Sequence, residues 1–127
     1  MIIDALNEFF AGQSLAANAT SKVIDLGNRG TGDTCIPVVL QITESAVGAG
    51  TAKVTFESSD TKAFTIAKEL ASTAAVPTAE LKTGYRFSIR SLPKTKLRWI
   101  RAKLVVTGLT GGKIEVAVVA DVDNYKD

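Results

Sequence analysis

Apolar and polar residues alternate along much of this chain, which is the period-two pattern of strands with one buried face. The clearest case lies in residues 92–108, LPKTKLRWIRAKLVVTG. One face of this stretch is apolar and consists of Ile100, Ala102, Leu104 and Val106. The other face carries Trp99, Arg101, Lys103, Val105 and Thr107. We therefore predict a strand that packs on the core with its first face and presents its second face outward.

Further strands are indicated at residues 21–27, 36–43, 52–57, 85–90 and 113–122. The glycine-rich segments AVGAGT at 46–51 and GLTGG at 108–112 separate neighbouring stretches and predict turns. On this interpretation the strands at 36–43 and 52–57 pair with each other, and the last strand follows a tight connection.

Two segments have a less regular pattern. Periodicity alone favours a short helix in residues 61–76, TKAFTIAKELASTAAV, because the apolar residues fit a helix face and Lys68 interrupts a strand. The first eleven residues, MIIDALNEFFA, have too few turns to form a helix that stands alone. Phe9 and Phe10 form either a flap on the core or a clasp on another subunit. We favour an N-terminal arm over residues 1–12, with these two phenylalanines as contact residues.

Short strands separated by glycine, proline and serine turns, with at most one helix, are typical of antiparallel all-β domains. The sequence therefore predicts a jelly roll or a two-sheet β-sandwich with an N-terminal arm. At 127 residues the chain is long enough for one core and too short for two, so we expect a single domain over residues 1–127.

The composition removes most classes of enzyme. The chain has no histidine, and thus lacks the commonest general base, the usual partner of a serine or cysteine nucleophile, and the imidazole metal ligand. Its acidic residues lie mainly at strand ends and outward positions, where solvation is their ordinary role. We therefore expect no enzyme, no cofactor and no metal.

The low cysteine content and the lack of a long apolar segment indicate the compartment in which the protein is made. Its single cysteine, Cys35, cannot form an internal disulfide, which fits a reducing compartment. There is no apolar run of about eighteen residues and no basic start followed by an apolar segment. We expect synthesis in the cytosol and no membrane partner.

Basic residues are concentrated in one part of the chain. The net charge is only +2, yet nine basic residues and no acid lie between Glu80 and Glu115. Such a block predicts a positive surface for an anionic partner, either an acidic protein surface or a single-stranded nucleic acid bound on the 82–113 face of a β-barrel. Trp99 lies within this block, and Trp and Arg are enriched at binding hot spots.

Two other interpretations of the basic block stay open. Neighbouring strands can supply acids in space, which would leave an ordinary solvated face. Trp99 can also lie flat under the aliphatic stems of Arg101 and Lys103.

Several pieces of the sequence occur in an order and spacing that resemble a known family. They are the initial I-D-A with the later V-I-D-L-G, the block AGTAKVTFESSDTKAF, and the R-W-I-R strand near the end. Together they resemble the capsid cement, or decoration, protein family of tailed bacteriophages, as in a Bordetella phage, over nearly the whole chain.

The resemblance implies a jelly roll or two-sheet sandwich that coats the exterior of a phage or prophage capsid in the virion. It implies that the protein bridges neighbouring major capsid subunits, and that it forms a homodimer or, alternatively, a homotrimer. It also implies strand and loop for Thr61 to Ala71 in place of a helix. As a hypothesis, the capsid or subunit contact is made by Arg86, Arg90, Trp99, Arg101, Lys103, Phe9 and Phe10.

Overall fold

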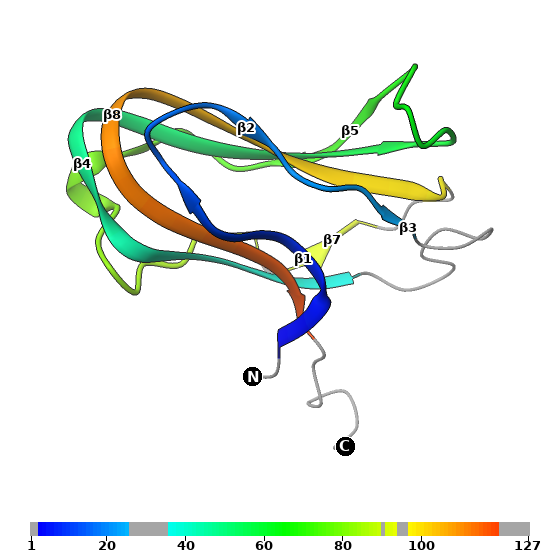
Figure 1. The fold of residues 1–127 in the computed structure, drawn as a ribbon, viewed down its shortest axis with the longest axis horizontal. Helices are drawn as coiled ribbons and strands as arrows, with labels where there is room; N and C mark the ends of the chain where they lie inside the picture. Colours follow the sequence, from blue (N-terminus) through cyan, green and yellow to red (C-terminus); the bar gives the residue numbers. More distant parts are fainter. Residues whose placement is uncertain (1–2, 26–35, 90, 94–96, 120–127) are drawn as a thin grey trace.

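The computed structural model describes residues 3–25, 36–89, 91–93 and 97–119, and these residues form one antiparallel sheet (Figure 1). Its long strands lie in the order β1 (Ile3–Ser14), β8 (Trp99–Val119), β4 (Ile36–Ser59) and β5 (Lys68–Ser72). The short elements are β2 (Ala19–Thr20), β3 (Ile24–Asp25), β6 (Val76–Pro77), the single 3₁₀ turn η1 (Thr78–Glu80) and β7 (Ser91–Leu92). The predicted all-β class is confirmed.

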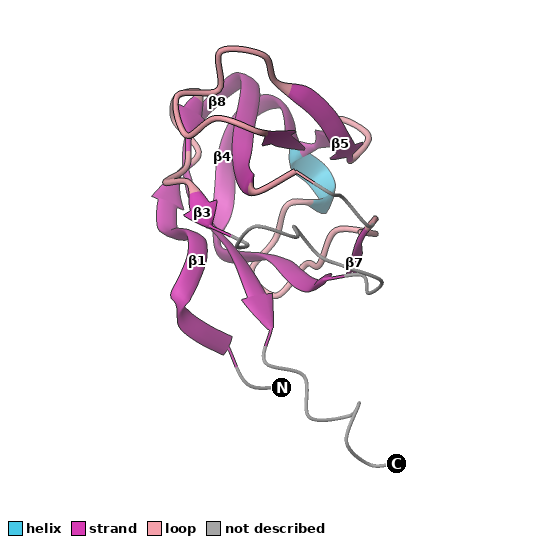
Figure 2. Cartoon of the chain, turned by 90° about the vertical axis from the view of Figure 1, so that its right-hand side faces the viewer, coloured by secondary structure: helices cyan, strands magenta, loops and turns pink. Residues whose placement is uncertain are grey.

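Strands β4 and β8 form one long ribbon that folds over on itself. They pair from Val38 with Val118 at one end to Ser59 with Trp99 at the other, and the register is irregular only between Ile42 and Thr51 of β4. At that irregular stretch the ribbon bends, so that its two halves lie one above the other (Figures 1 and 2). We call these halves, as they lie in Figure 1, the lower layer and the upper layer.

Each layer gains further strands from the rest of the chain. The lower layer consists of the first half of β4, the second half of β8 and β1, with β7 paired to the start of β4. The upper layer consists of the second half of β4, the first half of β8, and β2, β3, β5 and β6. The arrangement is a two-layer sandwich made by bending a single sheet.

The bend corrects two predictions. Residues 46–51 and 108–112 are not turns between strands, because β4 and β8 run through them without a break. The two halves of β4 consequently do not pair with each other, and each pairs with β8. Glycine makes this bend sterically possible: a Cβ on Gly50 would overlap the carbonyl oxygen of Thr107, and Gly108 has a left-handed φ of 71°.

The core lies between the two layers. Along β8 the alternation predicted from sequence is confirmed, since Ile100, Ala102 and Leu104 are fully buried. The layers meet at an aromatic contact in which the Phe9 and Phe56 rings lie 5.4 Å apart at 71°, an edge-to-face arrangement.

The prediction of a separate N-terminal arm is wrong for the residues that the structure describes. Residues 3–14 form β1, which pairs with β8. The β1 register shifts between Glu8 and Phe10, and this bulge allows the adjacent residues Phe9 and Phe10 both to be buried, each only 4% exposed. The two phenylalanines belong to the core of their own chain.

The helix that periodicity favours for residues 61–76 is also absent. A loop over residues 60–67 leads into β5, as the family resemblance implies. Strand β5 pairs with the end of β4, and a register shift opposite Phe56 lets Leu70 and Ala71 both pack against the core. Strand pairing therefore satisfies the backbone and places Leu70 against the core, whereas Ile66, which belongs to the same apparent helix face, is exposed.

Candidate protein-binding surface

The sequence-predicted contact residues of β8 lie on the outward face of the upper layer. Trp99, Arg101 and Lys103 are each partly buried, and they alternate with the fully buried residues of the same strand. On this face Trp99 pairs with Ser59 and Arg101 pairs with Glu57 across the ribbon. The three residues therefore share one face, as predicted.

Two cations lie over the Trp99 ring. The guanidinium carbon of Arg98 lies 4.7 Å from the ring centroid, and Nζ of Lys62 lies 5.8 Å from it. Arg98 in turn donates two hydrogen bonds to the carboxylate of Asp25, at 2.7 and 2.8 Å. This hydrogen bonding raises the pKa of Arg98 above its ordinary value. The cations on Trp99 thus come from the preceding residue and from the 60–67 loop.

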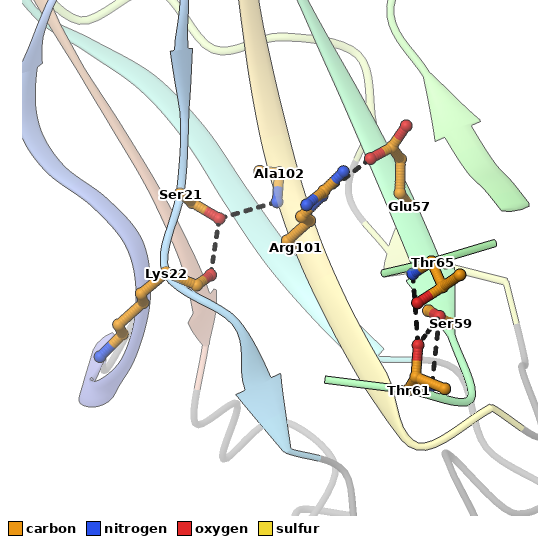
Figure 3. A network of polar contacts seen from close by, with 8 residues as sticks. All are labelled: Ser21, Lys22, Glu57, Ser59, Thr61, Thr65, Arg101 and Ala102. Carbon is orange, nitrogen blue, oxygen red and sulfur yellow. Dashed lines mark hydrogen bonds and ion pairs between the residues drawn. The ribbon is translucent and has the colours of Figure 1, made fainter. Parts of the chain in front are cut away.

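Arg101 is held by two groups of its own chain. Its Nε donates a hydrogen bond of 2.9 Å to Glu57 (Figure 3). Its guanidinium carbon also lies 4.2 Å from the centroid of the Phe64 ring. Arg101 therefore fastens the 60–67 loop to the upper layer, a role that the sequence pattern did not indicate.

The basic block is partly neutralised by neighbouring strands. Besides the Arg98 and Arg101 ion pairs, Lys113 lies 3.9 Å from Glu44. For these three cations the interpretation that neighbouring strands supply acids in space is confirmed, although the Arg101–Glu57 pair is largely buried. Lys103 stands beside Thr55 of β4 and Thr20 of β2 and has no ion pair in the part of the chain that the structure describes.

The other proposed contact residues lie elsewhere. Arg86 is exposed and bridges Gln41 in the lower layer, so it does not extend the row formed by Trp99, Arg101 and Lys103. Arg90 lies outside the described residues. The prediction that Phe9 and Phe10 are contact residues is wrong, because their burial in the core leaves no surface for a partner.

Two carboxyl groups meet on the outward face of the lower layer. Burial raises the pKa of Glu115, and a hydrogen bond to Glu8 and repulsion by its charge raise it further. Because the folded chain holds the Glu115 proton more tightly than the unfolded chain does, the free energy of unfolding falls as pH rises above about 4.5. The two carboxylates oppose each other at neutral pH.

Replacing Glu115 with glutamine is expected to stabilise the protein at pH 7 by less than about 1 kcal/mol, because the group is only partly buried and solvent screens its charge. The gain should shrink as pH falls to about 4, where the wild-type carboxyl is protonated. Denaturant titrations between pH 4 and pH 8 measure this difference. Glu80→Gln, at an exposed position of η1, is the control that removes a carboxylate elsewhere on the surface. A stabilisation by Glu115→Gln that is equal at every pH would contradict the carboxyl pair.

The structure adds one feature that the sequence did not reveal, the 60–67 loop over the end of the upper layer. Phe64 in this loop has a left-handed φ of 53°, the only positive φ of a non-glycine residue in the described ranges. The apolar spacing around it suggested a helix, and no turn signature marks the position of Phe64 itself. The Ser-Ser-Asp sequence at 58–60 marks only where the strand was expected to end.

Among the described residues, no three histidine, cysteine, aspartate or glutamate side chains gather as a metal site would require. The described part of the chain likewise has no helix with the length and apolar character needed to span a membrane.

Comparison with known proteins adds the family. A family model named Bbp16 matches residues 9–118, from the middle of β1 almost to the end of β8. The chain belongs to the Bbp16 family. The name indicates a Bordetella phage protein, which agrees with the resemblance to a phage family. No curated protein matches this Bbp16-family chain.

Proposed function

We propose that this Bbp16-family protein is a structural virion protein that binds the exterior of an assembled phage or prophage capsid and stabilises it by bridging major capsid subunits. The observation that carries the proposal is the family match over residues 9–118, which connects the chain to a phage. The ordered sequence pieces that resemble capsid cement proteins supply the finer role.

The fold supports such a role physically. A protein that reinforces a shell needs a rigid body and a contact surface, and it needs no catalytic group. The two layers share one continuous ribbon and one core, so a load applied to one layer passes directly to the other. Self-association as a homodimer or homotrimer belongs to the same proposal.

A role in binding single-stranded nucleic acid receives less support. Arg98, Arg101 and Lys113 of the basic block are matched by carboxylates within ion-pair distance. Trp99 is stacked with two cations of its own chain, and its ring is only partly exposed for a base.

The test is an immunoblot for this chain across a density gradient of particles from the strain that produces it. The major capsid protein is followed in parallel, together with an abundant cytosolic protein as the control for trapping. We expect the chain to migrate with DNA-filled heads in near-stoichiometric amount. Its presence only at the top of the gradient would refute the virion role. A salt-sensitive oligonucleotide shift would then favour the nucleic-acid alternative.

A further inference from the structure

The loop over residues 60–67 projects at one end of the molecule. It connects β4 to β5 at the end of the folded ribbon that lies opposite the bend (Figure 1). Its neighbours in the sheet are the first residues of β8, which begin at Trp99. The loop therefore lies at the end of the upper layer that is remote from the bend.

The loop is fixed in one conformation by side chains. Phe64 is only 7% exposed, and the Arg101 guanidinium covers its ring while Glu57 holds that guanidinium in place. A left-handed φ is unfavourable for a phenylalanine and persists only where the surroundings enforce it. Strain of this kind is concentrated at sites where a protein holds a loop ready for a ligand or a partner.

Hydrogen bonds from backbone N–H groups to two hydroxyl groups complete the loop, as Figure 3 shows. Ser59 Oγ accepts from the Thr61 N–H at 3.2 Å, and Thr61 Oγ1 accepts from the Thr65 N–H at 3.3 Å. The carbonyl of Thr61 accepts from the Phe64 N–H at 3.1 Å. The loop is thus organised before any partner binds, which lowers the entropy that binding would cost.

The fixed loop presents a large apolar side chain to solvent. Ile66 is 73% exposed, more than any other large hydrophobic residue in the described ranges, and it lies two positions after the buried Phe64. Around it in sequence are charged residues of both signs that form no ion pair in the part of the chain that the structure describes: Asp60, Lys62, Lys68 and Glu69. An apolar centre with a charged rim is the usual composition of a protein contact.

We infer that Ile66 is the anchor by which this protein docks on the capsid, in an apolar pocket of the outer capsid surface whose rim carries charges of both signs. The inference rests on the proposed function and names the contact within it. Arg101, Glu57 and Phe64 act behind the contact by holding the loop, and Lys62 connects the loop to Trp99. The contact is therefore centred on the loop and not on the outward face of β8.

The experiment compares Ile66→Asp with Val47→Asp. Val47 is 57% exposed and lies in the bend at the opposite end of the ribbon, so Val47→Asp places the same charge on another exposed apolar site. Each variant, carrying a tag, is produced alongside the untagged wild-type chain in cells that form particles. The tagged fraction on gradient-purified particles is then measured, with tagged wild-type chain as the reference. Thermal unfolding of the purified variants checks that both fold.

We expect Ile66→Asp to fall at least tenfold in particle occupancy, and Val47→Asp to stay within twofold of the wild type. Equal occupancy of the two variants would overturn the inference and leave the virion role intact. Absence of tagged wild-type chain from the particles would overturn the proposed function itself. Sedimentation of the free chains gives one further outcome: if Ile66→Asp abolishes self-association, the loop contacts a second copy and the capsid pocket is refuted.

Discussion

Replacing Gly50 with alanine is expected to destabilise the fold by about 3 kcal/mol or more, at the upper end of what an added methyl group costs. The new Cβ would overlap the carbonyl group of Thr107, and both groups belong to backbone at the bend of the ribbon. Neither strand can withdraw without breaking the pairing that continues on both sides of the bend. Denaturant unfolding monitored by Trp99 fluorescence measures the loss.

Gly111→Ala is the matched control for this prediction. Gly111 lies in the same bend, but a Cβ there would make only an ordinary contact of 3.5 Å with the Val47 side chain. We expect a change below about 1 kcal/mol at this position. Equal destabilisation by the two substitutions would show that the bend does not depend on the close approach at Gly50.

Replacing Phe56 with alanine is expected to cost about 3 to 5 kcal/mol, the range for removing a buried aromatic ring. Phe56 is fully buried in the upper layer, and its ring meets Phe9 from the lower layer. Total stabilities of domains are about 5 to 15 kcal/mol, so this one substitution removes a large part of the margin. The free energy of unfolding from urea titration is the measurement.

A double-mutant cycle with Phe9→Ala tests whether β1 belongs to the core. The edge-to-face contact predicts a coupling free energy of about 0.5 to 1.5 kcal/mol between Phe9 and Phe56. Val105→Ala, on the outward face of β8, serves as the control and should change stability by less than about 1 kcal/mol. Additive losses at Phe9 and Phe56 would show that the two rings do not meet in solution.

The local pattern of the strands was readable from the sequence. Alternation identified the buried faces of β8 and of the second half of β4, as Ile100, Leu104 and Phe56 show. The strand predicted at 85–90 is wrong for the described residues 85–89, which form only an isolated bridge at Arg86. What alternation does not encode is whether a glycine-rich segment reverses the chain or only bends it. The segments at 46–51 and 108–112 bend together because their backbones pass too close for a side chain at Gly50. This close approach exists only when β4 lies beside β8.

The candidate surface was predictable to a lesser extent. The shared face of Trp99 and Arg101 follows from their spacing, but the partners of these side chains lie far away in the chain. Glu57 reaches Arg101 across the ribbon, and Asp25 reaches Arg98 from β3. The Phe64 ring is covered by Arg101, which lies far away in the sequence, so no local signal announces the left-handed backbone at Phe64. The prediction of an N-terminal arm failed for the same reason, because β1 pairs with the last strand, which is distant in the sequence.

The folded ribbon also determines the order in which this protein can be completed during synthesis. The first strand of the lower layer, β1, pairs with residues 113–119, and the first half of β4 pairs with the same end of β8. Nearly the whole chain must therefore leave the ribosome before either segment finds its partner, and such distant pairings form slowly. Until then the apolar faces of β1 and β4 stay uncovered. The rate at which newly made chains become folded protein is thus limited by the arrival of the last strand.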